Sequence, residues 1–124
     1  MNIVGEIRFY LGKDYAHLKF SETRDAFSID TVLVPADHRG LGTGSLLVRH
    51  VLDMADAMGK EVLVSARPIG PVSPERLERL VRYYERFGFA VYDTGLTTAY
   101  MRRERAKPGR RPAEKPPSPA GPGV

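Results

Sequence analysis

Hydrophobic and polar residues alternate in three segments within the first third of the chain. Residues 2–10, 15–20 and 26–34 are rich in β-branched and aromatic side chains with a period near two, which predicts three strands. Turn-forming residues at 12–14 and 23–25 separate these segments. Connections this short favour an antiparallel meander, because each strand must return beside the one before it.

The middle of the chain changes to a helical period. Apolar residues recur every three or four positions between 43 and 58, which predicts an amphipathic helix ended by Gly59. The predicted apolar face consists of Leu47, Val51, Met54, Ala55 and Met58. Residues 61–66 predict a fourth strand, and a strand–helix–strand unit places that strand parallel to 26–34.

A second helix and a hairpin complete the pattern. Ser73 is a good N-cap, and Pro74 suits the first helical position. The apolar stripe that follows consists of Leu77, Leu80, Val81, Tyr84 and Phe87. We expect Gly88 to end this helix, because glycine adopts the left-handed conformation of a C-terminal residue at little cost. Residues 89–93 and 97–101 predict a closing hairpin.

The order βββ-α-β-α-ββ predicts a single α/β domain over residues 1–103, with a mixed and mainly antiparallel sheet. A chain of 124 residues is long enough for one such domain. No apolar run approaches the roughly 18–20 residues of a membrane helix, and the N-terminus lacks the pattern of a signal peptide. We therefore expect a cytoplasmic protein that does not associate with membranes.

The cysteine and histidine content limits which metal sites and nucleophiles the protein can have. The sequence has no cysteine, which excludes disulfides, thiolate metal sites and a cysteine nucleophile. The three histidines, His17, His38 and His50, lie far apart in the sequence, so we expect no metal site.

The positive charge is concentrated at the C-terminal end. The formal net charge is +4, but residues 102–124 hold seven basic and two acidic residues, so the remainder is close to neutral. Because residues 104–124 are basic and proline-rich with little apolar surface, we expect them to form a disordered tail. Such a tail either keeps the protein soluble or binds weakly to an acidic partner or nucleic acid.

A glycine-rich segment lies between the third strand and the first helix. The first amides of a helix have no intrahelical partner and carry the positive end of its dipole, so small residues there favour an anion such as a phosphate or pyrophosphate. The residues expected at this site are Arg39, Gly40, Leu41, Gly42, Thr43, Gly44 and Ser45. Neither the Walker pattern nor the dinucleotide fingerprint fits this segment. A purely structural turn is the alternative.

Two motifs resemble the GCN5-related N-acetyltransferase (GNAT) family. The first, Arg39-Gly40-Leu41-Gly42-Thr43-Gly44 after a strand ending in Val34, is similar to Arg/Gln-x-x-Gly-x-Gly/Ala. The second, Tyr84 followed by Gly88-Phe89, is similar to Tyr-x-x-x-Gly-Phe. A helix, a strand and a helix separate the motifs in the family's order, and the resemblance covers about residues 2–103.

The resemblance implies an enzyme that moves an acetyl group from acetyl-CoA to an amine by direct attack in a ternary complex. The glycine-rich segment would hold the pyrophosphate. A strand bulge at Val32, Leu33 and Val34 would present backbone groups to the cofactor's arm, in a central splay between strands 26–34 and 61–66. Tyr84 would be the general acid, although its place on the apolar stripe also suits a core residue.

The base is less well defined by the residues. Asp30, expected to share side-chain parity with Val32 and Val34, is the candidate general base, and a solvated strand residue is the alternative. Ser65 could position a water molecule, and Tyr83 is a weaker candidate acid than its neighbour. We expect His38 to be a surface residue of the loop.

The chain departs from the family pattern at its start. Only about 33 residues precede Val34, and three strands use them, so the helices that usually cover the acceptor side are missing. This implies an open acceptor side for an exposed lysine, an N-terminus or a small amine, or a homodimer in which a second subunit covers it. Leu77 replaces a common cofactor-binding asparagine.

Two further function classes stay open. A GNAT-like fold that binds coenzyme A or a partner without catalysis would also explain the missing cap. A nucleic-acid-binding protein acting through its basic tail is the third hypothesis.

Overall fold

The computed structural model describes residues 3–68, 70–71 and 73–106. The strands are β1 (Ile3–Leu11), β2 (Asp14–Glu22), β3 (Ala26–Leu33), β4 (Glu61–Ala66), β5 (Ala90–Thr94) and β6 (Ala99–Arg103). The helices are α1 (Thr43–Met58) and α2 (Pro74–Glu85), with a short 3-10 turn, η1 (Ala36–His38). The predicted element order is confirmed, and the predicted bounds of α1 and β4 are those observed.

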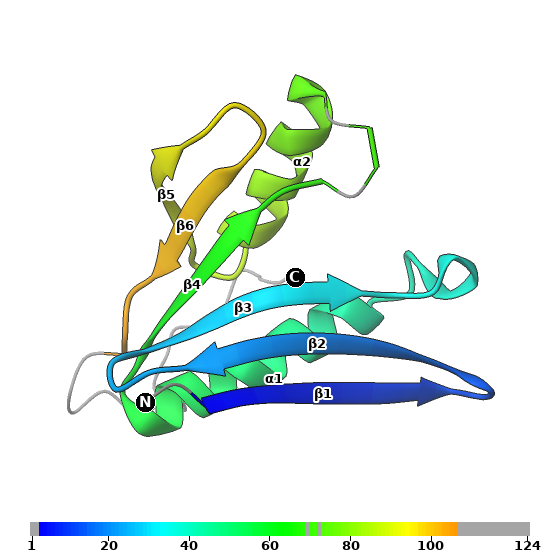
Figure 1. Cartoon of the computed structure of the whole chain (residues 1–124), viewed down its shortest axis with the longest axis horizontal. Coiled ribbons are helices and arrows are strands. Elements are labelled where there is room, and N and C mark those ends of the chain that lie inside the picture. Colours follow the sequence, from blue (N-terminus) through cyan, green and yellow to red (C-terminus); the bar gives the residue numbers. More distant parts are fainter. Residues whose placement is uncertain (1–2, 69, 72, 107–124) are drawn as a thin grey trace.

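All six strands form one mixed sheet in the order β1-β2-β3-β4-β6-β5 (Figure 1). The meander of β1, β2 and β3 is antiparallel, as predicted, and only β3 and β4 run parallel. The hairpin of β5 and β6 folds back so that β6 lies antiparallel beside β4. The chain therefore has the single α/β domain expected from its sequence, with a sheet that is mainly antiparallel.

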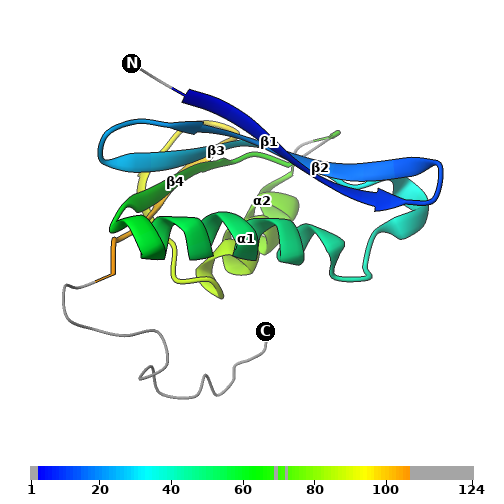
Figure 2. The ribbon, with the colours of Figure 1, turned by 90° about the horizontal axis from the view of Figure 1, so that it is seen from below.

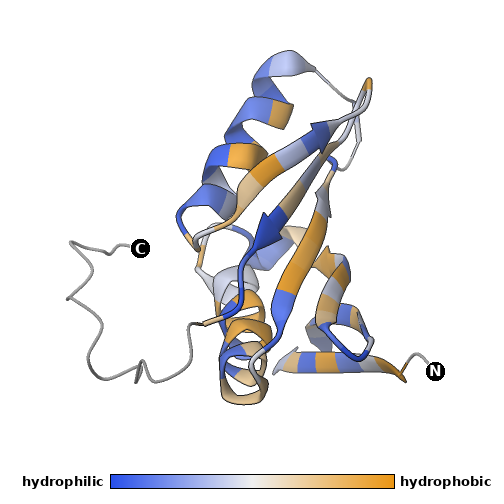
Figure 3. Ribbon diagram, turned by 90° about the vertical axis from the view of Figure 1, so that its left-hand side faces the viewer, coloured by the Kyte–Doolittle hydropathy of each residue, from blue (hydrophilic) through white to orange (hydrophobic). Residues whose placement is uncertain are grey.

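Both helices pack against the same face of the sheet (Figure 2). Within the described residues no helix covers the opposite face, which we call the bare face. Helix α1 lies under the meander, while α2 packs against β4 and β5. Helix α1 is more buried than α2 and also more apolar. Apolar residues predominate in α1, whereas α2 is mostly hydrophilic (Figure 3).

The core lies between α1 and the sheet, because apolar side chains of alternate strand positions meet the apolar face of the helix. The largest fully buried side chains are Leu18, Phe27, Val48, Val51, Leu52, Val62 and Met101. One predicted core position is wrong. Met58 is 54% exposed because it is the last residue of α1 and has neighbours on one side only.

The predicted helix signals are present, with one shift. The Ser73 hydroxyl accepts a hydrogen bond from the Arg76 amide at 3.1 Å, and Pro74 is the first residue of α2. Gly59 ends α1 in the left-handed conformation with φ of 67°. Helix α2 ends at Glu85, three residues before Gly88.

The prediction of a disordered tail falls mostly outside the described residues. Residues 104–106 are described and have no regular secondary structure. Residues 107–124 lie outside the described part of the chain.

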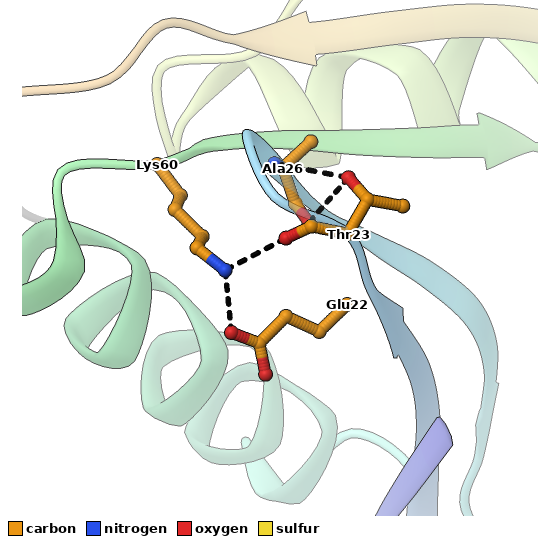
Figure 4. A network of polar contacts seen from close by, with 4 residues as sticks. All are labelled: Glu22, Thr23, Ala26 and Lys60. Atoms are coloured by element: carbon orange, nitrogen blue, oxygen red, sulfur yellow. Dashed lines mark hydrogen bonds and ion pairs between the residues drawn. The ribbon is translucent and has the colours of Figure 1, made fainter. Parts of the chain in front are cut away.

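Polar contacts hold β3 and β4 together where both strands begin (Figure 4). The Lys60 ammonium, one residue before β4, donates to a carboxylate oxygen of Glu22 and to the Thr23 carbonyl oxygen. The Thr23 hydroxyl in turn accepts from the Ala26 amide at 3.2 Å and so closes the turn before β3. These contacts fix the end of the sheet at which β3 and β4 stay paired.

A second ion pair links β6 to α1 and to the turn after α2. The Arg103 guanidinium of β6 donates to both carboxylate oxygens of Asp56 in α1, at 2.9 and 3.2 Å, and to the Phe87 carbonyl oxygen at 3.0 Å. Both charged side chains are only 13% exposed. A buried, bidentate pair of this kind fixes orientation more strongly than surface pairs do.

We predict that Asp56→Ala lowers the free energy of unfolding by about 2–4 kcal/mol, because the guanidinium of Arg103 stays buried without its partner. Urea denaturation measures this loss. The control is Glu78→Ala, which removes an ion pair with Arg82 whose side chains are each 63% exposed. The control should cost less than about 0.5 kcal/mol. Equal losses for the two variants would contradict the proposed importance of the buried pair.

Candidate active site

The turn between β3 and α1 depends on glycine. Gly40 and Gly42 have φ of 82° and 84°, in the left-handed region that other residues rarely adopt. Gly42 is the N-cap of α1 and provides no side-chain hydrogen bond to the helix. The backbone thus turns sharply from the strand into the helix without a side chain over the helix end.

The first three amides of α1 have no partner within the helix. The first intrahelical hydrogen bond runs from the Leu46 amide to the Gly42 carbonyl oxygen, at 3.1 Å. The amides of Thr43, Gly44 and Ser45 precede it, at the positive end of the helix dipole. They are suited to bind an anion.

Arg39 anchors the loop. Its Nε donates to the Val34 carbonyl oxygen at 3.0 Å, immediately after β3. The side chain remains exposed and borders the cleft described next.

The expected splay between β3 and β4 is present. The two strands pair only from Ala26 opposite Glu61 to Ile29 opposite Val64. Beyond Ile29, β3 continues to Leu33 without a β4 partner, and the strands diverge (Figure 1). A cleft of about 1120 Å³ opens there.

The strand irregularity lies earlier than expected. Phe20 pairs with Ile29 but the preceding residue, Lys19, pairs with Thr31, so Asp30 is the extra residue of a β-bulge. We expected the bulge at residues 32–34.

The bulge also corrects the predicted parity of Asp30. Ile29 and Val32 pair with Phe20 and Leu18, and all four pack into or against the core. Side chains alternate between the two faces of the sheet along a strand. Without the extra residue, the side chain of Val32 would therefore lie on the other face of the sheet from that of Ile29. Asp30 therefore does not share the face of Val32.

Asp30 is exposed and accepts a hydrogen bond from the Ser21 hydroxyl at 2.7 Å. Ser21 follows the core residue Phe20, so it lies on the face of the sheet away from the helices. Ser65, exposed on β4, borders the same cleft from its other side. The cleft thus passes from the helix side of the sheet to its bare face.

Tyr84 is both a core residue and a cleft residue. It is 7% exposed, and its ring packs edge-on against Phe89 at a centroid distance of 5.6 Å. Its hydroxyl makes no hydrogen bond with the described residues, among which no fully buried side-chain oxygen or nitrogen lacks a partner. The hydroxyl must therefore reach the cleft. Burial raises the pKa of Tyr84 to about 12.

Tyr83 links the two helices, which sequence reasoning missed. Its hydroxyl is 2.9 Å from the Ser45 hydroxyl in the first turn of α1. Burial raises the pKa of Tyr83, although the hydrogen bond to Ser45 opposes this shift. No sequence signal pairs these two residues, because the contact depends on how α1 and α2 pack.

The cleft contains only part of the predicted site. Of the predicted residues, those that line it are Asp30, Val32, Val34, Arg39, Gly44, Ser65, Tyr83 and Tyr84. Those outside its lining are Leu33, His38, Gly40, Leu41, Gly42, Thr43 and Ser45. Leu41 is 72% exposed and Leu33 is 41% exposed, whereas Thr43 is buried. The glycines outside the lining shape the turn rather than the wall.

Three arginines of the lining were not predicted: Arg67 after β4, and Arg76 and Arg79 on α2. The spacing of Arg76, Arg79 and Tyr83 places them on one helix face, which was a readable signal. Among the described residues, no group of acidic side chains and histidines could hold a metal ion. None of the helices in that part of the chain is long and apolar enough to cross a membrane.

A family model described as the acetyltransferase (GNAT) family matches residues 2–89. The chain belongs to this family. Membership implies acyl-CoA-dependent acetyl transfer in general, and hence a transferase that binds coenzyme A.

Solved structures share the fold at low sequence identity. The anti-CRISPR protein AcrVA5 has a TM-score of 0.60 at 24% identity, over 79% of this chain and 97% of that chain. An acyl-CoA N-acyltransferase from Pseudomonas aeruginosa has a TM-score of 0.65 at 22% identity, over 81% and 67%. PaiA N-acetyltransferase from Thermoplasma acidophilum, in complex with coenzyme A, has a TM-score of 0.64 at 13% identity, over 82% and 60%. A search of curated proteins found no match.

Proposed function

We propose that this GNAT protein transfers an acetyl group from acetyl-CoA to a primary amine by direct attack in a ternary complex. The observation that supports this most is the start of α1, where three unpartnered amides adjoin the splay between β3 and β4. An anion site beside an open strand edge suits a ligand with a diphosphate and an amide-containing arm.

The residues fit acetyl-CoA in two ways. The amides of Thr43, Gly44 and Ser45 would hold the diphosphate, and the absence of a side chain at Gly44 lets it approach. The edge of β3 beyond Ile29, which has no β4 partner, would hydrogen-bond the pantetheine arm. Bound acetyl-CoA supplies an activated thioester with a thiolate leaving group.

Tyr84 would be the general acid. Its hydroxyl reaches the cleft, and its raised pKa of about 12 keeps it protonated at neutral pH. The hydroxyl holds a proton that it can donate to a leaving thiolate as the carbon–sulfur bond breaks.

Asp30 would be the general base. It is the single carboxylate that borders the cleft among the described residues, and the Ser21 hydroxyl orients it. An amine attacks only after it has lost a proton, and an exposed carboxylate on the bare face can accept that proton directly or through a water molecule at Ser65.

The acceptor would enter from the bare face of the sheet, where Asp30 and Ser65 border the cleft. An open approach suits an exposed lysine, a protein N-terminus or a small amine. A homodimer covering this face, contacts of the basic tail with an acidic partner or nucleic acid, and a cytoplasmic location stay predictions from the sequence.

A second candidate is a module that binds coenzyme A without catalysis. The observation in its favour is that Tyr84 packs as a core residue, at 7% exposure. The two candidates share the cofactor site and differ in whether an amine is acetylated.

The first test is acetyl-CoA binding by isothermal titration calorimetry. We predict that the wild type binds and that Gly44→Glu weakens binding by about tenfold or more, because a carboxylate would occupy the anion site. Ala57→Glu, an exposed position at the far end of α1, is the matched control and should bind as the wild type does. An unbound wild type, or equal binding by wild type and Gly44→Glu, would contradict the proposed site.

The second test separates catalysis from binding. We predict that Tyr84→Phe lowers kcat on an amine panel that includes lysine peptides by about 100-fold or more, while its Kd for acetyl-CoA changes little. Tyr83→Phe is the neighbouring control and should lose less turnover. Since the pKa of Tyr84 is about 12, ionisation of this residue should not lower the wild-type rate between pH 7 and 10.

Wild-type turnover in Tyr84→Phe would refute its role as the acid. Acetyl-CoA binding without acetylation of any amine in the panel would favour the non-catalytic module.

A further inference from the structure

Strand β1 forms one free edge of the sheet, and β5 forms the other (Figure 1). Along its nine residues β1 pairs with β2 on one side only, and the pairing is regular throughout. Because the hydrogen bonds of an antiparallel pair alternate, about half of the residues of β1 direct their amide and carbonyl groups away from β2. No other strand of the described residues pairs with those groups.

The two edges of the sheet differ in how they are protected from further pairing. Edge strands are commonly short or bulged, or they carry lysine or proline. Strand β5 has five residues and an irregular register between Val91 and Asp93. Strand β1 is longer and regular, and it contains neither lysine nor proline. It also carries exposed apolar side chains near its ends, with Val4 73% and Tyr10 64% exposed. The edge of β1 is therefore suited to pair with another strand.

The sequence of β1 is self-complementary about Ile7, its central residue. If the same strand of a second copy pairs antiparallel about Ile7, Glu6 of each copy lies opposite Arg8 of the other. Each remaining position then faces an apolar residue or a glycine. These pairs are Ile3 with Leu11, Val4 with Tyr10, Gly5 with Phe9, and Ile7 with Ile7. All nine residues of the strand thus have a compatible partner in one symmetric arrangement.

The neighbouring symmetric registers bring like charges together. Paired residues must point to the same face of the sheet, so a symmetric antiparallel pair is centred on a residue rather than between two residues. Centring the pair on Glu6 would place two carboxylates directly opposite each other, and centring it on Arg8 would do the same with two guanidinium groups. Like charges directly opposite are destabilising. The charges of β1 therefore favour the register about Ile7.

The two charged side chains are available for such pairing. Both point to the bare face, because Ile7 between them packs against the core. The Arg8 guanidinium donates to a carboxylate oxygen of Glu6 at 3.3 Å and lies 4.6 Å from the centre of the Tyr15 ring. A guanidinium has five N–H donors, so it can bind a second carboxylate without releasing the first. In the symmetric pair the four side chains would form one network of alternating charge.

We propose that β1 pairs antiparallel with β1 of a second copy of this chain about Ile7, and so joins the two six-stranded sheets into one. This dimer differs from one that covers the bare face, because edge pairing extends that face and leaves it open. The inference does not depend on the proposed function, since neither Glu6 nor Arg8 borders the cleft. A single pair of strands buries a small area, so the dimer should be reversible and depend on concentration.

The test is sedimentation velocity at protein concentrations from about 1 to 500 µM, a range in which a small interface of this kind should associate. The wild type should dimerise within this range. Glu6→Arg and Arg8→Glu should each weaken association by about tenfold or more, because the two-fold symmetry makes two attractive pairs repulsive at once.

An equimolar mixture of these two variants should associate again. Glu6→Arg has two positive charges on the strand and Arg8→Glu has two negative charges, so each chain offers the other the opposite charge at both positions. A fold defect in either variant could not be repaired in this way. Restored association would therefore report pairing between chains in the register about Ile7.

A charge reversal elsewhere is the matched control. Glu78→Arg reverses a charge in an exposed ion pair with Arg82 on α2 and should dimerise as the wild type does. Circular dichroism checks that each variant is folded.

A wild type that stays monomeric over the whole range would overturn the inference. A dimer that survives both charge reversals would overturn it too, because association would then use another surface. Failure of the two variants to associate when mixed would exclude the register about Ile7. Acetyl-CoA binding, which tests the proposed function, is measured separately and is not decided by any of these results.

Discussion

Three backbone amides at the start of α1 have no partner within the helix, and the N-cap residue provides them with no side-chain hydrogen bond. Gly42 enters the helix in a left-handed conformation and provides no cap, whereas Ser73 caps α2 with its hydroxyl. A capped start would have satisfied an amide of α1 in the same way. The two helices therefore differ in what their first turns can bind, and only α1 offers amides at the splay of the sheet.

The splay of β3 and β4 opens the cleft beside this candidate anion site. Lys60 and its partners hold β3 and β4 together where the strands begin, and the pairing ends at Ile29. Both helices lie on one face of the sheet (Figure 2). Residues of α2 line the cleft on that side, and Asp30 and Ser65 border it on the other. In the proposed reaction the cofactor and its acceptor would approach the cleft from these two sides. Tyr84 serves both core and cleft, since its ring is buried while its hydroxyl reaches the opening.

Local sequence signals predicted the helices and strands well, because each signal depends only on residues next to it in the chain. The bounds of α1 and β4 follow from glycine at the ends of the helix and from a short β-branched run. The glycine turn before α1 was readable for the same reason. The bulge at Asp30 was not, because register depends on the pairing partner, and the extra residue reversed the expected parity of the strand.

Contacts between elements that are far apart in the sequence could not be predicted either. The bond between Tyr83 and Ser45 joins residues 38 positions apart, and it depends on how the two helices pack. The spacing of Arg76 and Arg79 was visible, but the sequence did not indicate that this face of α2 borders the cleft.

The most direct measurement of the central claim is a titration of isotope-labelled protein with acetyl-CoA, followed through backbone amide resonances. The account predicts that the largest changes occur at Thr43, Gly44 and Ser45, because their amides acquire a diphosphate as hydrogen-bond acceptor. Binding that leaves these three resonances in place while it shifts residues elsewhere would contradict it.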